Sequence, residues 1–175
     1  MKNKEKRNVV LFAASQGGHF AEMMKLKDLF GKYESVLATD NLKATKERED
    51  LKAFKHIAYS KATAERREKE AGKKQGSRWK LNTLWTYFRL FTRCFVIYVK
   101  YRPQIIISTG SHIAVPFFIY GKIFGSKTLY IESNAKVYSK SMTGKLVERF
   151  SDKIYVQWPE MLNVYPQAEY HGVLH

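Results

Sequence analysis

A histidine at position 19 follows two glycines at a point where the chain is expected to pass from strand to helix. The motif Ser15-Gln16-Gly17-Gly18-His19 comes directly after an apolar run at residues 9–14 and directly before a helical pattern over residues 20–30. Glycines let the backbone approach a ligand closely, and the free amides at a helix N-terminus favour an anion. The motif therefore predicts a phosphate or diphosphate site formed by Ser15, Gly17 and Gly18, with the His19 imidazole beside it. The alternative is a tight turn with a capping histidine.

Two further loops are expected at the same edge of the predicted sheet. They are Thr109-Gly110-Ser111-His112 and Ser133-Asn134-Ala135-Lys136, and each follows an apolar, strand-like run. Ligands of parallel sheets bind at the carboxyl ends of the strands, where such loops follow. The residues that we expect to complete the anion site are Gly110, His112 and Asn134.

Glu132 ends an apolar strand, where a carboxylate usually faces a cleft. Together, His19 and Glu132 have the chemistry to orient and deprotonate a sugar hydroxyl. Separately, each could merely hydrogen-bond loop backbone, and the residues alone leave both roles open. No metal and no cofactor are expected, because the five histidines are scattered and no His, Cys, Asp or Glu pair has the spacing of metal ligands.

The architecture follows from the order of apolar runs along the chain. Strand-like runs occur at residues 9–14, 33–39, 54–59, 104–108, 127–132 and 153–157, with helical patterns between several of them. This alternation predicts an α/β fold, a Rossmann-like parallel sheet with helices on both faces. A length of 175 residues suits one domain spanning residues 1–175.

The chain is strongly basic, with 31 Lys and Arg against 16 Asp and Glu and a formal net charge of +15. This favours an anionic partner, namely nucleic acid, an anionic membrane surface or a phosphorylated substrate. Nucleic acid is not expected, because the aromatic residues lie in apolar runs instead of alternating with exposed base contacts. The single cysteine, Cys94, excludes a disulfide within the chain and fits a reducing compartment. The first apolar run is too short for a secretory signal or a membrane span, so we expect a cytoplasmic domain.

A basic stretch followed by an aromatic helix predicts contact with a membrane. Residues 61–80 hold eight basic and three acidic residues, and residues 81–101 form a helical pattern with a wide apolar arc. Interfacial aromatic rings beside positive charges favour a helix that packs partly on the sheet and partly in an anionic membrane surface. The residues expected at the membrane are Arg78, Trp79, Lys80, Trp85, Phe88, Arg89, Phe91, Arg93 and Phe95. A solvated loop and an ordinary buried crossover helix are the alternatives.

Several motifs together resemble a known family. They are Ser15-Gln16-Gly17-Gly18-His19, Ser108-Thr109-Gly110, Tyr130-Ile131-Glu132-Ser133, Ser141-Met142-Thr143-Gly144-Lys145-Leu146 and Val156-Gln157-Trp158-Pro159-Glu160. Their order and spacing resemble the membrane-associated subunit of the two-chain UDP-GlcNAc transferase of the dolichol pathway. They resemble still more its bacterial relatives, the PssD and CpsF type proteins of capsule and exopolysaccharide assembly. A weaker likeness reaches the N-terminal half of the peptidoglycan lipid II synthase, a single-chain GT-B enzyme.

The resemblance implies a split glycosyltransferase, in which this chain is equivalent to the N-terminal, acceptor-side half of a GT-B enzyme. A separate partner would hold the nucleotide sugar, and this half would attach to the cytoplasmic face of the plasma membrane as a peripheral or monotopic protein. The implied reaction transfers a sugar to an undecaprenyl-diphosphate-linked acceptor, and the chain is expected to be inactive alone. Length supports this independently, because a GT-B enzyme needs two domains of about 100–150 residues each.

The resemblance also assigns residues. It aligns Gly17, Gly18 and His19 with the turn that faces the lipid diphosphate in the single-chain relative, and Glu132 and Asn134 with its acidic strand-end motif. Gly110 and His112 lie on the loop that corresponds to a third glycine-bearing element.

The end of the chain resembles the tail with which the family meets its catalytic subunit. The residues expected at that interface are Trp158, Pro159, Tyr170, Gly172, Val173 and Leu174. The rival interpretation is a pure membrane scaffold with no active-site residues, which recruits a self-sufficient glycosyltransferase.

Overall fold

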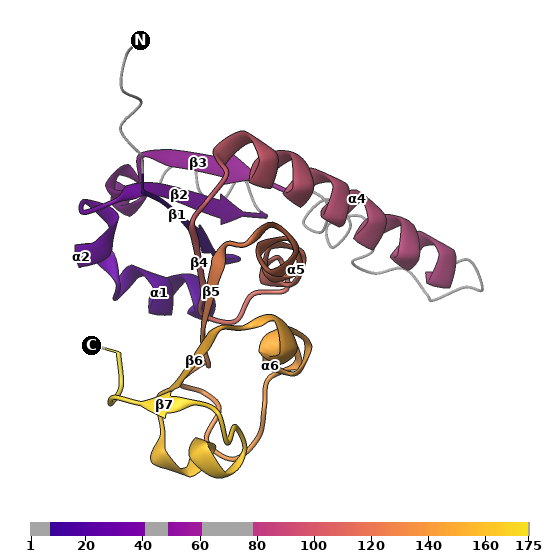
Figure 1. The fold of residues 1–175 in the computed structure, drawn as a ribbon. Helices are drawn as coiled ribbons and strands as arrows, with labels where there is room; N and C mark the ends of the chain where they lie inside the picture. The colour runs from indigo at the N-terminus through magenta and orange to yellow at the C-terminus, as the bar shows by residue number, and fades with distance from the viewer. Residues whose placement is uncertain (1–7, 41–48, 61–78, 175) are drawn as a thin grey trace.

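A seven-stranded parallel sheet forms the centre of the molecule (Figure 1). The computed structural model describes residues 8–40, 49–60 and 79–174, with the side chains of residues 79–82 outside the description. The strands are β1 (Val9–Ala13), β2 (Glu34–Thr39), β3 (His56–Tyr59), β4 (Ile105–Ser108), β5 (Lys127–Ile131), β6 (Lys153–Val156) and β7 (Glu169–Tyr170). Their order is β3-β2-β1-β4-β5-β6-β7, and every neighbouring pair is parallel. The predicted parallel sheet is therefore confirmed, with the two-residue β7 as an addition.

Helices cover both faces of this sheet, as predicted. The α-helices are α1 (Gly18–Met24), α2 (Lys27–Phe30), α4 (Trp79–Tyr101), α5 (Ala114–Phe124) and α6 (Met142–Val147). Short 3-10 turns are η1 (Glu49–Ala53), η2 (Glu148–Phe150) and η3 (Pro159–Asn163). In Figure 1, α1 and α2 lie on one side of the sheet, and α4, α5 and α6 lie on the other. The single helix expected over residues 20–30 is divided, because a turn at Lys25 and Leu26 separates α1 from α2.

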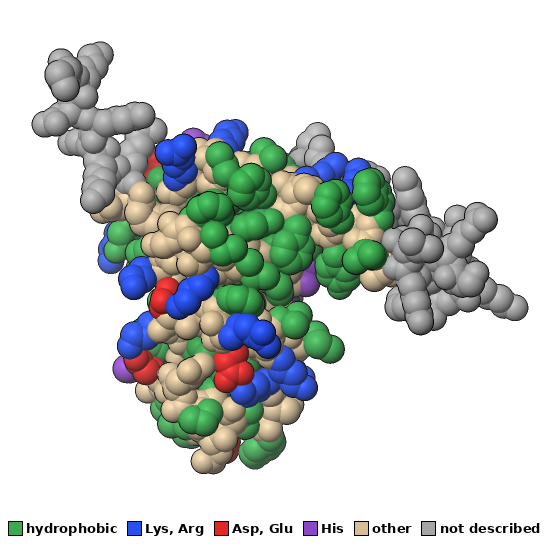
Figure 2. Space-filling view, turned by 45° about the vertical axis from the view of Figure 1, so that its right-hand side comes forward, with side chains coloured by type: hydrophobic (Ala, Val, Ile, Leu, Met, Phe, Trp, Pro, Cys, Tyr) green, Lys and Arg blue, Asp and Glu red, His purple; other side chains and the backbone are tan. Residues whose placement is uncertain are grey.

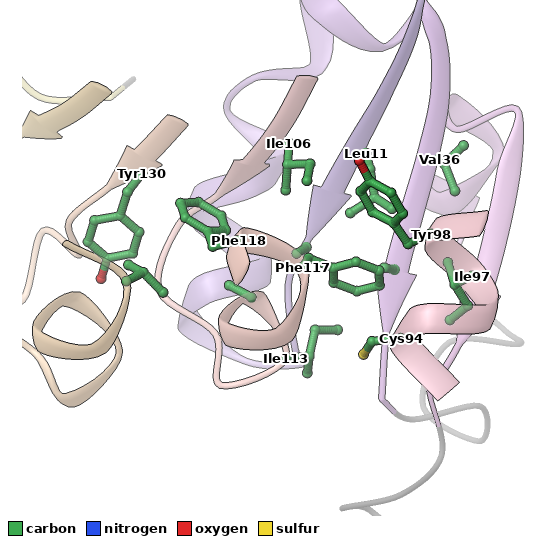
Figure 3. Close-up of a cluster of buried hydrophobic side chains, with 14 of the residues drawn as sticks. Leu11, Val36, Cys94, Ile97, Tyr98, Ile106, Ile113, Phe117, Phe118 and Tyr130 are labelled. Carbon is green, nitrogen blue, oxygen red and sulfur yellow. The ribbon is translucent and has the colours of Figure 1, made fainter. Parts of the chain in front are cut away.

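Alternating side chains of β1 divide the hydrophobic core into two layers. Val10 and Phe12 pack with α1 and α2, where the ring of Phe12 lies 4.8 Å from that of Phe30. Leu11 and Ala13 pack with α4 and α5 on the other face. Figure 3 shows this second layer, in which side chains of the strands meet those of the two helices.

Cys94 of α4 lies in the second layer with no exposed surface. Burial raises the pKa of its thiol, so this cysteine acts as a small apolar core residue.

The topology places the functional loops together. The strands β1, β4 and β5 are parallel neighbours, so the segments that follow them all start at the same edge of the sheet, the one formed by the carboxyl ends of the strands. Only four residues separate the end of β1 from the start of α1, so the N-terminus of α1 stays close to the carboxyl ends of these strands.

Candidate functional site

The glycine turn after β1 has a backbone that only glycine adopts readily. Gly17 has φ 102° and ψ −147°, and α1 begins at the next residue. No side chain caps this helix, so the structure does not support the alternative interpretation of a capping histidine. Gly17 and Gly18 are exposed, and a Cβ on either would meet no atom within 4 Å. The turn is therefore open on its outer side, and it offers unhindered backbone there.

The turn is tied to the loop after β4. The hydroxyl of Ser111 donates a hydrogen bond to that of Ser15 over 2.9 Å. The Thr109 hydroxyl donates to the backbone carbonyl of His19 over 2.6 Å. These two bonds hold the loops after β1 and β4 in one fixed arrangement.

The His19 ring is oriented by a backbone carbonyl. Its Nδ1 lies 3.0 Å from the carbonyl oxygen of Thr109. Because a carbonyl oxygen only accepts hydrogen bonds, Nδ1 carries a proton and donates it. No protein group within the described ranges bonds to Nε2. In the neutral ring, Nε2 therefore carries a lone pair that can accept a proton from a ligand.

Gly110 makes room for that ring. It has φ 112°, and a Cβ there would lie 2.9 Å from both Cε1 and Nδ1 of His19. Any other residue at this position would push the imidazole away and strain the backbone.

We expect Gly110→Ala to lower the free energy of unfolding by about 1–3 kcal/mol, because it combines a forbidden φ with this contact. The displaced ring should also slow the sugar transfer that the resemblance of the motifs implies. Urea unfolding and a transfer assay measure the two effects. Gly31→Ala is the matched control, since a Cβ there meets no atom within 4 Å. Wild-type stability and wild-type transfer in Gly110→Ala would contradict this role of Gly110.

Glu132 is fully buried, so the expectation that it faces an open cleft is wrong. Its Oε1 accepts hydrogen bonds from the Tyr130 hydroxyl (3.1 Å) and the Ser133 amide (2.9 Å). Its Oε2 accepts from the Ser141 amide (3.1 Å) and the Tyr165 hydroxyl (2.7 Å). Four protein donors thus satisfy the carboxylate, which connects β5 to the start of α6 and to the segment after η3.

The residues around the Glu132 carboxylate pack closely against it. A Cβ at Gly144 would collide with the Tyr165 hydroxyl and with the carboxylate itself. Burial and the neighbouring Glu132 charge raise the pKa of Tyr130 and of Tyr165, so both phenols remain hydrogen-bond donors. This cluster has the geometry of a structural support for the loops at the site.

Glu22 is a site residue that the sequence interpretation missed. Its Oε1 accepts from the Ser133 hydroxyl (3.0 Å) and the Asn134 amide (2.8 Å). It lies three residues after His19 on α1, and residues at this spacing share a helix face. That spacing was the available signal. Through His19 and Glu22, the α1 helix is fixed to the loops after both β4 and β5.

The other two predicted ligand residues lie at the same edge of the sheet. His112 Nε2 is 3.7 Å from Oδ2 of Asp40, the residue that follows β2. The Asn134 carbonyl accepts a hydrogen bond from the indole of Trp158 over 2.7 Å. The described residues contain no cluster of His, Cys, Asp or Glu that could hold a metal ion.

The predicted membrane residues divide into two groups on α4. Trp85 (61% exposed), Phe88 (56%) and Phe95 (41%) lie open to solvent, as does Arg89. Figure 2 shows hydrophobic side chains gathered over this helical face of the molecule. Arg78 lies outside the described residues, as do the side chains of Trp79 and Lys80. No helix in the described part of the chain has the length and apolar character needed to cross a membrane.

Phe91 and Arg93 turn toward the protein instead. The Phe91 ring packs against Tyr120 of α5 at 6.3 Å between centroids. Arg93 donates to the carbonyl oxygen of Ser60, just after β3. These two residues join α4 to the rest of the domain.

The predicted partner-binding tail folds against the α1 and α2 face of the sheet. The Leu174 amide donates to Oε1 of Gln157, and Lys25 donates to the Leu174 carbonyl. Residues 171–174 line an apolar cavity of about 340 Å³ together with side chains of β4, β5 and β6. Tyr170 remains exposed, and Pro159 begins η3.

The fold defines a Rossmann-like domain that is structurally similar to those of GT-B glycosyltransferases. The crystal structure of MurG from Acinetobacter baumannii is similar with a TM-score of 0.60 and 13% sequence identity, covering 88% of this chain and 42% of the MurG chain. The predicted fold class is therefore confirmed.

The chain belongs to the family described as "Oligosaccharide biosynthesis protein Alg14 like", whose sequence profile matches residues 9–174. The "UDP-N-acetylglucosamine transferase subunit ALG14" of Yarrowia lipolytica is 33% identical over 81 residues, which are 43% of this chain and 38% of that protein. The mouse protein of the same name is 25% identical over 178 residues, covering 93% of this chain and 81% of the mouse protein. The chain thus aligns with less than half of the yeast relative and most of the mouse one.

Proposed function

We propose that this chain is the acceptor-side subunit of a two-chain glycosyltransferase. Its partner holds a nucleotide sugar, and the sugar passes to a lipid-diphosphate-linked acceptor at the cytoplasmic face of a membrane. The observation that carries the proposal is the His19 imidazole, whose Nδ1 is bound to the Thr109 carbonyl while Nε2 is left for a ligand beside the open Gly17-Gly18 turn. The names of the relatives, which call them transferase subunits, support a separate donor-binding chain.

In the proposed reaction, the acceptor diphosphate lies against the turn formed by Ser15, Gly17 and Gly18. Nε2 of His19 accepts the proton of the attacking hydroxyl, whose oxygen forms the new bond to the anomeric carbon. The nucleoside diphosphate leaves from the opposite side of the anomeric carbon and stays with the partner, so the configuration at that carbon is inverted. The Thr109 carbonyl stabilises the imidazolium that forms, because Nδ1–H already points at it.

The remaining candidate residues support this arrangement. Gly110 leaves space for the imidazole, and His112 and Asn134 lie on the loops that border the acceptor. Glu132 is assigned a structural function here, because its four hydrogen bonds leave no lone-pair direction open toward solvent. The partner docks on the surface that contains Trp158, Pro159 and Tyr170 and on the tail formed by Gly172, Val173 and Leu174.

The setting that we propose is bacterial capsule or exopolysaccharide assembly, with undecaprenyl diphosphate as the lipid. This is supported by the likeness of the motifs to the PssD and CpsF type proteins. In this proposal the described residues act as one domain built on a single sheet, and the transfer needs no cofactor.

Membrane attachment is proposed for the exposed face of α4. Trp85 and Phe88 stack at 5.5 Å between centroids and lie open to solvent, and Arg89 lies beside them. Aromatic rings next to positive charge are typical of helices that lie in the membrane interface. In the sequence, the basic stretch at residues 61–80 runs into the start of this helix, and residues 61–78 lie outside the described residues.

We expect replacement of both Trp85 and Phe88 by serine to reduce binding to anionic vesicles at least tenfold. Burial of each ring in the membrane interface contributes up to about 1.5–3 kcal/mol to the free energy of binding. Flotation with vesicles measures the binding. Tyr138→Ser is the control, because it removes an even more exposed ring (78%) from the segment between β5 and α6. A wild-type chain that does not float with anionic vesicles would refute membrane attachment. Equal binding by the double variant would refute the location on α4.

The scaffold interpretation is tested by measuring sugar transfer by the partner chain alone. If the donor-binding chain transfers sugar at the full rate without this subunit, then this chain only recruits an enzyme. We expect negligible transfer by either chain alone and full transfer on mixing.

A further inference from the structure

A groove of about 600 Å³ opens between the C-terminal end of α4 and the C-terminal end of α5. It lies at the amino ends of β4 and β5, because Gln104 and Lys127 at the starts of these strands line it. The glycine turn and His19 lie at the carboxyl ends of the same sheet. The groove is therefore a separate feature from the proposed acceptor site.

We propose that this groove binds one anionic phospholipid, with an acyl chain along its apolar walls and the phosphate on Arg102. The proposal rests on the proposed membrane attachment and adds a defined lipid site to it.

The walls of the groove are apolar and exposed. Phe95, Val99 and Phe124 are each more than two-fifths exposed, which is unusual for large apolar side chains that lie together. The ring of Phe124 lies 6.2 Å from that of Phe95 and 5.4 Å from that of Tyr98. Such a surface suits a hydrocarbon chain better than water.

The floor of the groove is preformed by a chain of hydrogen bonds. The Ser126 hydroxyl donates to the Pro103 carbonyl over 2.6 Å. Because that uses its only proton, the Tyr98 hydroxyl must donate to Ser126, also over 2.6 Å. These bonds join the end of α4 to the start of β5, so the groove does not depend on a ligand for its shape.

Arg102 stands at the mouth of the groove in an unfavourable conformation. Its φ is 45°, and its amide closes α4 by donating to the Tyr98 carbonyl over 2.7 Å. Glycine is the usual residue where a helix ends in this way. Arg102 is exposed, and it forms no ion pair or side-chain hydrogen bond with any residue that the structure describes. A strained backbone that presents an unpaired cation is typical of a binding residue.

The other charges at this end of the domain are partly neutralised. Lys122 lies 3.8 Å from Asp152, and the same carboxylate lies in the field of Lys127. Among the residues that line the groove, Arg102 is therefore the cation with no carboxylate beside it, and Lys127 is a second contact on the rim.

Apolar walls beside a cation match an amphiphile with a phosphate head group. Free phosphate would leave the walls uncovered. The proposed acceptor lipid would need its diphosphate at the opposite edge of the sheet, one strand length or about 13 Å away. A phospholipid of the surrounding membrane fits both the chemistry and the position.

The test uses Arg102→Gly, which removes the cation and relieves the backbone. We expect its affinity for phosphatidylglycerol vesicles to fall at least fivefold, while its thermal midpoint stays the same or rises. Lys32→Gln is the matched control, because it removes one exposed positive charge between α2 and β2 that does not line the groove. Native mass spectrometry of the chain in detergent should show one bound phosphatidylglycerol for the wild type and the control, and none for Arg102→Gly.

Each other outcome has a distinct meaning. If the wild type does not bind phosphatidylglycerol vesicles at all, the proposed membrane attachment fails. If it binds them and Arg102→Gly matches Lys32→Gln, only the groove proposal fails. Competition by inorganic phosphate alone, or preference for undecaprenyl phosphate over phosphatidylglycerol in the same assay, would overturn the assignment of the occupant.

Discussion

Replacement of His19 by alanine is expected to reduce sugar transfer by the reconstituted pair of chains roughly a hundredfold or more, the usual contribution of a general base. Complex formation with the partner should be unchanged, because the His19 ring is bonded to Thr109 and not to the surface assigned to the partner. The loss should appear as a lower maximal rate at saturating donor and acceptor.

Two further variants separate the chemistry of His19 from its packing. In His19→Asn the amide nitrogen can still donate to the Thr109 carbonyl, but no Nε2 is present, so we expect the same loss of transfer in a stable protein. His56→Ala serves as the control, since His56 begins β3 and pairs with Glu34 at the start of β2, at the amino ends of these strands. Full transfer by His19→Ala would refute a direct role.

Replacement of Glu132 by alanine is expected to lower the free energy of unfolding by about 3–5 kcal/mol, as when one partner of a buried charged network is removed. The change leaves the Tyr165 hydroxyl and two backbone amides without their acceptor, and leaves the Tyr130 hydroxyl only the Ser141 hydroxyl as a partner. Chemical unfolding followed by circular dichroism measures the loss. Glu160→Ala, which removes an exposed glutamate, should have no comparable effect.

This second experiment also decides how Glu132 works. A stable Glu132→Ala protein that binds its partner but transfers no sugar would restore the chemical role that its strand-end position first suggested. An unstable protein supports the structural role described above.

The sheet and the glycine turn could be predicted because their signals are local. Each of the six expected strands is a short apolar run, and the turn contains the two glycines that its backbone requires. The two-residue β7 carries no such run and was missed. The break at Lys25 and Leu26 was also missed, since apolar residues continue through it.

The environment of the two carboxylates could not be predicted, because their partners are distant in the sequence. Tyr165 lies 33 residues from Glu132, and Asn134 lies 112 residues from Glu22. Only the packing of η3 and α1 against the end of β5 brings these groups together. In the same way, Arg93 resembles an interfacial cation in the sequence, but the end of β3 supplies Ser60 as its partner 33 residues away.

The hydrogen bond between His19 and the Thr109 carbonyl has an evolutionary consequence. Many proteins orient a histidine with a carboxylate, which a single point mutation can delete. Here the orienting group belongs to the main chain, and every residue type at position 109 supplies it. A change of side chain at position 109 therefore keeps the acceptor for Nδ1 and removes only the hydroxyl bond to the His19 carbonyl, whereas Gly110, which must leave space for the ring, has little freedom to vary.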